Sequence, residues 1–279
     1  MFSINLNSIL LALLVSVAWY FGTIELLWVF SDLGNNWYWY ALAVLYTVII
    51  NELFGHLICS HNLFSVNTHS WTYRILVFLI IVDHAYGPLT NLVQNHQNHH
   101  IYPDQGNKDN LDFKRHWNTV CSLSPLMFLY QKETIYPGVK QYVEKQKKIH
   151  GDILNDDWTF FCEEFKIPLT LVYWSLLYLL FPLLLFKIVF MGRVIISVIT
   201  FLTTLVGHTK ITGYRNFDVK NNTSNHLFLH YIVGLGLFSS FLHNNHHSKC
   251  WLKTGTHSDK WYEIDIGSYI IKFLKLGLK

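Results

Sequence analysis

The longest apolar runs of the chain come in two pairs. A helix that crosses the hydrocarbon core of a bilayer needs about 20 consecutive, mostly apolar residues. Four runs reach or approach that length, at about 4–21, 37–53, 167–186 and 189–206. They predict four transmembrane helices in two hairpins. The first run has no basic residues before it and no small-residue cleavage site after it, so we expect a retained anchor and not a signal peptide.

Two further apolar runs, at 75–82 and 227–242, do not fit a membrane span. The first stops at Asp83, and the second is interrupted by His230 and Gly234. Both are too short or too broken to cross a bilayer, so we expect them to lie at the membrane interface or to pack inside the protein.

The distribution of Lys and Arg predicts the orientation of these spans. Basic residues are frequent in 55–166 and 208–279, whereas residues 1–54 contain none, and Lys187 and Arg193 flank the link between the last two runs. Loops rich in Lys and Arg stay on the cytoplasmic side. We therefore expect both soluble parts to be cytoplasmic. Four spans then put both termini on that side as well.

The composition agrees with a membrane protein. Of the 279 residues, 51% are hydrophobic and 14% are charged, against about a quarter charged in soluble domains. The sequence thus predicts an all-α integral membrane protein forming a single unit over residues 1–279. The formal charge of +3 is too small to indicate a nucleic-acid partner. The four cysteines are scattered without a CxxC pair, so no disulfide framework or zinc knuckle follows.

Histidine is the residue that carries chemistry in this chain. The sequence contains 16 histidines, and half of them fall into three clusters. These clusters are HLICSH at 56–61, HQNHH at 96–100 and HNNHH at 243–247. All three lie outside the predicted spans, in the parts that we expect to be cytoplasmic. We therefore expect a cytoplasmic helical cap that holds a histidine-rich site for two metal ions.

The spacing within the clusters suggests how they would share the ions. On an α-helix His96 can converge with His99 and with His100, whereas His99 and His100 point about 100° apart. Those two could serve different ions with His96 between them. His56 and His61 would lie about 140° apart on an ideal α-helix. Their separation suits two neighbouring ions, or a helix that frays here, better than one ion.

The number of imidazoles indicates two ions. Eight exceed what one ion normally takes, and imidazole favours Zn, Cu, Fe or Ni over Mg or Ca without selecting among them. His208, at the end of the fourth run, is a further candidate because ionisable residues there are often functional. The predicted ligands are His56, His61, His96, His99, His100, His208, His243, His246 and His247. Glu52 could orient His56 as a hydrogen-bond acceptor, or be an ordinary interfacial carboxylate. The remaining histidines are expected at the surface or in structural hydrogen bonds.

The order of the clusters resembles that of the membrane fatty-acid desaturases, which carry HxxxxH, HxxHH and HxxHH boxes around two helical hairpins. The resemblance is closest to the bacterial and acyl-CoA type and covers about 55–278. Three further stretches carry it: HQNHHIYPD from His96, GYRNFD from Gly213 after Gly207-His208, and WYEIDIG from Trp261. Thr204 stands where many family members have an asparagine.

The resemblance implies a reaction and its partners. Two non-heme irons held by the box histidines would activate O2 and remove two hydrogens from adjacent methylenes, with water as the other product. The substrate would be a fatty-acyl chain on CoA, acyl carrier protein or phospholipid, receiving a cis double bond, with delta-9 as one candidate position. The chain contains no HPGG heme motif. A separate ferredoxin or cytochrome b5 would therefore supply the two electrons.

Two other readings stay open. A related di-iron hydroxylase acting on an alkane, sterol or carotenoid would use the same oxidant, and only product analysis separates the two. A membrane metal transporter or a non-catalytic metal-binding membrane protein is the other. Transporters place ionisable ligands within their spans near the midplane, whereas these clusters lie outside the predicted spans.

Overall fold

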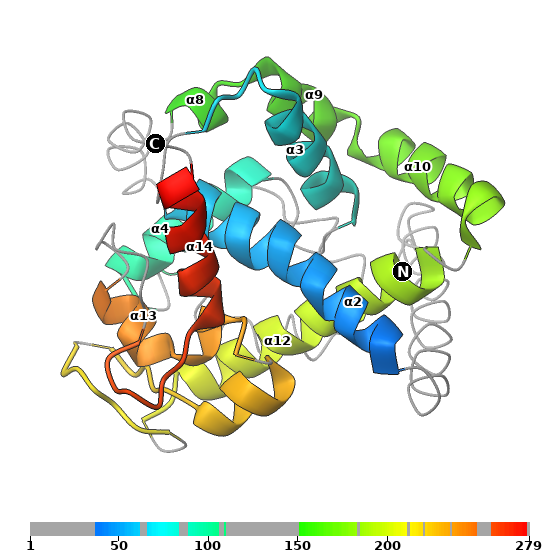
Figure 1. The fold of residues 1–279 in the computed structure, drawn as a ribbon. Coiled ribbons are helices and arrows are strands. Elements are labelled where there is room, and N and C mark those ends of the chain that lie inside the picture. The colour runs from blue at the N-terminus through cyan, green and yellow to red at the C-terminus, as the bar shows by residue number, and fades with distance from the viewer. Residues whose placement is uncertain are drawn as a thin grey trace, which may run out of the picture.

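The structure is a computed structural model in which every described element is helical (Figure 1). It describes residues 37–61, 66–83, 89–105, 109, 151–182, 185–210, 213–219, 221–234, 236–249 and 258–277. The first predicted span, 4–21, lies outside these residues. Within them there is no β-strand, only isolated bridges from Asn225 to Tyr214 and Leu242. The all-α prediction is thus confirmed for the described part of the chain.

The second predicted span lies in a long helix at the centre of the fold. It begins as α2 (Trp37–Thr47) and continues as the π-helix η1 (Val48–Ser60). Thr47, at the junction, has helical angles of φ −61° and ψ −41°, so the helix is not interrupted. The stretch Tyr38–Ser60 is the one helix among the described residues that is long and apolar enough to cross a membrane. The candidate span extends past residue 53, where the sequence placed its end, and includes His56.

The third and fourth predicted spans coincide with helices, but neither is established as a membrane span. Helix α10 (Lys166–Leu180) has 15 residues and is followed by Pro182, which cannot continue a helix. The π-helix η2 (Leu185–Phe190) leads into α12 (Met191–Gly207), which has 17 residues. Helix α10 does not reach the length that a bilayer requires, whereas η2 and α12 together run from 185 to 207 without a break. Tyr38–Ser60 is nevertheless the one described helix that is both long and apolar enough for a span. The described residues therefore do not establish four transmembrane helices.

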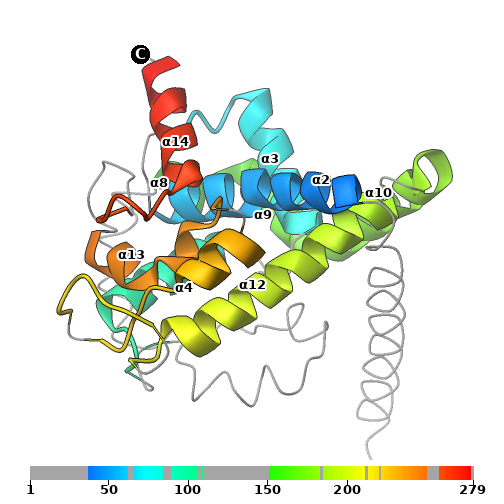
Figure 2. The same cartoon turned by 60° about the horizontal axis from the view of Figure 1, so that its bottom comes forward.

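Two hydrophobic cores flank the long helix. On one side Val48 and Leu53 pack with Ile195 of α12 and with Phe241 of the 3₁₀-helix η4 (Ser239–Phe241). On the other side Phe54 packs with residues of four helices. These are α3 (Trp71–Asp83), α4 (Leu89–Ile101), α8 (Gly151–Leu154) and α9 (Asp157–Glu164). Figure 2 shows α2 and α12 side by side. The long helix is the element on which the others are placed.

The two broken apolar runs fold as short elements packed against this helix. The 75–82 run lies in α3, where Val77 and Ile80 are buried while Ile75 is exposed. The 227–242 run forms the π-helix η3 (Leu229–Val233) and η4, separated by Gly236 with φ +67°. A positive φ favours glycine because it has no Cβ. Helices α13 (His243–Lys249) and α14 (Ile266–Gly277) follow.

A buried carboxylate joins three of the helices. Asp83, at the end of α3, is fully buried. It accepts hydrogen bonds from the hydroxyl groups of Tyr46 and Tyr173 and from Nε1 of Trp174 at 3.2 Å. Because buried charges are stable only when hydrogen-bonded, this arrangement fixes α10 to α2 and α3.

Candidate metal centre

The nine predicted histidine ligands come together from four elements. Two lie at the end of η1, three on α4, one directly after α12 and three on α13. The nitrogens of eight of them form two groups, in each of which the ligand atoms lie within 4.8 Å of one another. Each group could hold a metal ion. We call these two groups the first and second histidine clusters, and we call the three runs in the sequence the histidine boxes.

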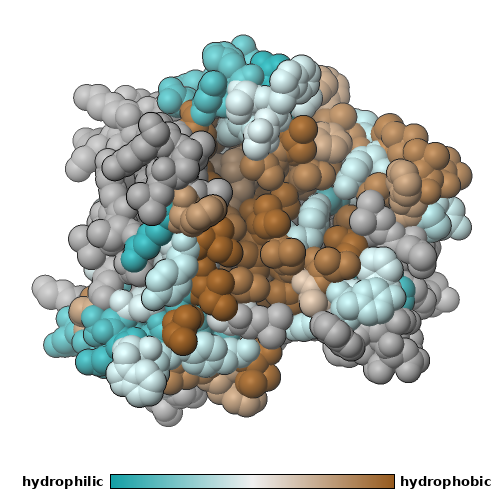
Figure 3. Space-filling view, in the orientation of Figure 1, coloured by the Kyte–Doolittle hydropathy of each residue, from teal (hydrophilic) through white to brown (hydrophobic). Residues whose placement is uncertain are grey.

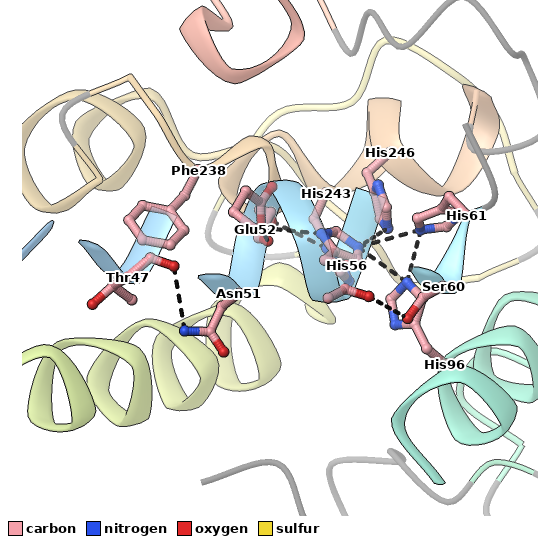
Figure 4. A network of polar contacts seen from close by, with 12 residues as sticks. Thr47, Asn51, Glu52, His56, Ser60, His61, His96, Phe238, His243 and His246 are labelled. Carbon is pink, nitrogen blue, oxygen red and sulfur yellow. Dashed lines mark hydrogen bonds and ion pairs between the residues drawn. The ribbon is translucent and has the colours of Figure 1, made fainter. Parts of the chain in front are cut away.

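The first histidine cluster consists of His56, His61, His96 and His246 (Figure 4). The Nε2 atom of His56 lies 3.0 Å from Nε2 of His96, 3.2 Å from that of His61 and 3.3 Å from that of His246. The Nε2 atoms of His61 and His96 are 2.8 Å apart. Four imidazoles from η1, α4 and α13 thus point their Nε2 atoms at one place.

The π-helical winding of η1 explains why His56 and His61 share a cluster. In a π-helix the hydrogen bond joins residues five apart, so such residues lie above one another. The backbone N–H of His61 donates to the carbonyl of His56 at 3.1 Å, and the hydroxyl of Ser60 donates to the carbonyl of Gly55 at 2.9 Å. The expectation of two different ions for His56 and His61 assumed an α-helix and is wrong for that reason.

The second histidine cluster consists of His99, His208, His243 and His247. The Nε2 atoms of His243 and His208 are 2.7 Å apart, and those of His247 and His99 are 3.1 Å apart. His208 therefore lies with the box histidines, although it belongs to none of the three boxes. All four residues are buried.

His100 lies between the two clusters. Its Nε2 is 3.0 Å from Nε2 of His96. Its ring centroid is 4.6 Å from that of His246 and 4.3 Å from that of His247. The sequence placed His96 between the ions, whereas His96 belongs to the first cluster and His100 borders both. His99 points into the second cluster, as expected from its angle to His100 on α4.

Three carboxylates fix the orientation of ligand rings. Each accepts a hydrogen bond from the Nδ1 of a histidine: Glu52 from His56 at 3.0 Å, Asp109 from His99 at 2.9 Å and Asp104 from His208 at 2.8 Å. Such acceptors set the tautomer and the ring direction of metal-binding histidines. Glu52 was one of the two readings from the sequence. Asp109 was missed, since it follows His99 by ten residues and no helical spacing relates the two.

The tautomers that these bonds impose make the second cluster suited to a cation. The Nδ1 of His243 also has an acceptor, the carbonyl of Ser240 at 3.1 Å. If His99, His208 and His243 each donate through Nδ1, their Nε2 atoms carry lone pairs. The lone pairs of two Nε2 atoms that lie 2.7 Å apart, as in His208 and His243, repel one another unless a cation lies between them. The donor set fits a transition-metal ion and not Mg or Ca.

Burial keeps these imidazoles neutral. Desolvation, together with the neighbouring histidines, lowers the pKa of His96, His100, His243 and His247 well below its ordinary value. For His208, burial lowers the pKa although Asp104 opposes the shift. Neutral imidazole is the form that binds metal, so these five residues are in the ligating state at neutral pH.

The other histidines are not part of the clusters where the structure describes them. His230 is fully buried between the carbonyls of Phe238 and Ile264. His226 contacts the carbonyl of Val206 at 3.0 Å, and His69 is exposed. These positions agree with the structural or surface roles expected for them. His84, His116, His150 and His257 lie outside the described residues.

Comparison of the chain with protein-family models and with curated proteins finds no match. The function must therefore be inferred from the chain's own residues.

Proposed function

We propose that this protein is an integral-membrane, O2-dependent fatty-acyl desaturase whose two histidine clusters hold two non-heme irons. The observation that carries the proposal is the pair of adjacent clusters built from imidazole alone, of which the first is half-buried and the second is buried. A single structural zinc needs four ligands, and nine histidines in contact exceed that need. Two neighbouring ions in a nitrogen-only shell suit redox chemistry with O2 better than acid–base hydrolysis, which also needs a general base.

The reaction requires no general acid or base beyond the metal ligands. An unactivated methylene C–H bond offers no acidic proton, so the oxidising power must come from metal and O2, which bound iron would supply. The acyl chain loses two hydrogens from adjacent carbons. Together with two electrons and two protons from outside, they reduce O2 to two molecules of water. The protein's own residues hold the ions and exclude bulk water.

The surface of the described helices supports a membrane location. Helix α10 has no buried residue, and large apolar side chains project from it, among them Leu171 and Leu179, which are 61% and 74% exposed. A helix that is apolar all round is typical of burial or of contact with lipid. On the face in Figure 3, apolar side chains extend from α2 to α10. With Tyr38–Ser60, this surface supports membrane association. Because Lys and Arg are concentrated in 55–166 and 208–279, the proposal places the metal centre and both termini of a multi-pass protein in the cytoplasm.

The remaining partners follow from the chemistry. The substrate is a fatty-acyl chain carried by CoA, acyl carrier protein or phospholipid, which reaches the site from the bilayer. The two electrons come from a separate ferredoxin or cytochrome b5.

The test is expression in a host without desaturases, together with a ferredoxin or cytochrome b5, followed by mass spectrometry of the fatty acids. We expect a new cis-monounsaturated chain that disappears in His247→Ala. His69→Ala, which changes an exposed histidine, is the matched control and should keep the product. The position of the double bond, delta-9 or another, is read from the same spectra.

Other results would change the assignment. A hydroxylated chain would make the protein a di-iron hydroxylase of an alkane, sterol or carotenoid. An unchanged lipid profile with purified protein that binds no iron would remove the di-iron proposal. A protein that binds metal but oxidises no lipid with either donor would be left as a non-catalytic metal-binding membrane protein.

A further inference from the structure

A network of buried polar side chains joins the third histidine box to the C-terminal segment. Its hub is Glu263, which is only 1% exposed and comes from the WYEIDIG stretch. Its partners lie on α13 and on the loops at 214–216 and 259–260. The metal ligands themselves are not among these partners.

Both oxygens of Glu263 accept more than one hydrogen bond. Oε1 accepts from the hydroxyl of Tyr214 and from Nδ2 of Asn216, each at 2.6 Å. Oε2 accepts from Nδ2 of Asn245 at 2.8 Å and from the backbone N–H groups of Asp259 and Lys260 at 2.6 and 2.9 Å. Burial alone would raise the pKa of Glu263, but these bonds hold it below its ordinary value. The carboxylate is therefore charged at neutral pH.

Asn245 passes this constraint to α13. Besides donating to Glu263, its side chain accepts from Nδ2 of Asn216 at 2.9 Å and from Nδ2 of Asn225 at 2.8 Å. Oδ1 of Asn225 in turn accepts from the backbone N–H groups of Asn244 and Asn245 at 2.9 and 3.2 Å. These N–H groups have no partner within the first turn of a helix. Asn225 thus caps the start of α13 and also holds the side chain of Asn245, which is not a metal ligand.

The rotation of α13 about its axis decides where three ligands point. Helix α13 has seven residues, too few to be stable alone. It sends His246 to the first cluster and His243 and His247 to the second. A small turn of the helix would move ligands of both clusters at once.

We propose that Glu263 is a positioning residue of the metal centre. Through Asn245 it fixes the rotation of α13, and with it the direction of His243, His246 and His247. The inference depends on metal binding by the two clusters, and neither on desaturation nor on the identity of the natural metal.

The test measures Co²⁺ binding to the full chain in detergent, by competition with a chelator and by visible absorption. In Glu263→Gln one acceptor oxygen becomes an NH2 group, which cannot accept a hydrogen bond from the donors that surround it. Either the side chain of Asn245 or the loop at 259–260 is then released. We expect Co²⁺ affinity to fall by about 10–100-fold, as for other residues that orient ligands, and the Co²⁺ bands to shift. A purely structural role would lower the unfolding temperature but leave affinity and bands unchanged in the folded variant.

Two further variants make the test specific. Asn245→Ala should produce the same loss, and the double variant should lose no more than either single variant because both act on one contact. Asp265→Asn is the matched control. This carboxylate lies in the same stretch, but it accepts from the backbone N–H of Ser268 at 3.1 Å at the start of α14. It should change stability and not affinity.

The outcomes are distinct. Unchanged affinity and bands in folded Glu263→Gln, or additive losses in the double variant, would overturn the proposal. If Glu263→Gln does not fold, Asn245→Ala decides: a shift in the Co²⁺ bands supports the proposal, and an unchanged spectrum refutes it. Absence of Co²⁺ binding by the parent chain would instead refute the metal centre on which the inference rests.

Discussion

The Nε2 atoms of His56 and His61 lie 3.2 Å apart although five residues separate them in the chain. The π-helical bond from His61 to His56 produces this proximity, since residues five apart stack in a π-helix. π-helical turns occur often at functional sites, and here the winding has a definite consequence. Both histidines of the HxxxxH box face a single cluster.

We therefore expect His61→Ala to remove a ligand from the first cluster alone. The affinity of one bound Co²⁺ should fall by more than the ~10–100-fold typical of outer-shell changes, while the second ion is retained. Competition with a chelator that resolves two binding steps is the measurement. His230→Ala is the control, because this buried histidine bonds two backbone carbonyls outside the clusters. It should lower stability but keep both ions. Equal loss of both ions in His61→Ala would contradict the division into two clusters.

The carboxylates predict a second pattern of selective loss. Glu52 supports His56 of the first cluster, whereas Asp109 supports His99 of the second. Replacing an orienting carboxylate by its amide leaves the volume but weakens the hydrogen bond that fixes the ring. Glu52→Gln should therefore weaken the first site and Asp109→Asn the second, each by about 10–100-fold. The same chelator competition checks it, and the two variants serve as each other's controls. Losses at the same site in both would contradict this assignment.

The sequence predicted contacts of this centre that arise within one helix better than contacts made by loops that return to it. Spacing on one helix was enough to predict that His99 and His100 point in different directions. The order of the three boxes was enough to predict that histidines from distant segments form one site. The π-helix could not be predicted from the sequence, because VIINELFGHLICS is equally compatible with α-helical winding. Asp109 and the link from Glu263 to Asn245 were also invisible. Each depends on how a loop returns to the site, and no periodicity encodes that.

The same limit applies to the membrane spans. Apolar runs predict where helices form, and α10 and α12 lie where they were expected. The ends of helices depend on local chemistry. Pro182 stops α10 early, whereas nothing stops the central helix at residue 53, so it continues to Ser60.

Close contact at Gly207 predicts sensitivity of the second cluster to a single methyl group. A Cβ at this position would lie 3.2 Å from Cγ and Cδ2 of His243, so the imidazole would have to shift by a few tenths of an ångström. We expect Gly207→Ala to lower the affinity of the second site by roughly 10-fold, the lower end for displaced ligands. Its effect on the first site should be small, since His243 belongs to the second cluster.

Gly192→Ala is the matched control on the same helix. Its Cβ would lie 2.9 Å from Oγ1 of Thr47, so the added methyl group would strain the contact between α12 and α2. This contact includes none of the clustered histidines. Thermal unfolding should detect this change, whereas chelator competition should not. A loss of metal affinity in Gly192→Ala as large as that in Gly207→Ala would mean that general helix displacement, and not the contact with His243, sets the effect.

The buried Glu263 and the half-buried Glu163 predict opposite dependences of stability on pH. Hydrogen bonds lower the pKa of Glu263 below 4.5 despite burial, so its contribution to stability is present above that value and is lost as the pH falls through the folded-state pKa. Burial raises the pKa of Glu163 above 4.5, although Thr90 donates to it at 2.8 and 2.9 Å. Its contribution is therefore present below 4.5 and is lost as the pH rises through its folded-state pKa.

Unfolding temperatures of the metal-free protein between about pH 3 and 7, across the ordinary range of carboxyl titration, test both signs. Glu263→Gln should flatten the fall in stability on the acidic side of 4.5 and leave the region above it unchanged. Glu163→Gln should do the reverse, so each variant is the control for the other. An unaltered acid limb in Glu263→Gln would show that its carboxylate is not held in the charged form by Tyr214, Asn216 and the backbone N–H groups of Asp259 and Lys260. The anchoring of α13 would then have to come from the contacts of Asn216 and Asn225 with Asn244 and Asn245.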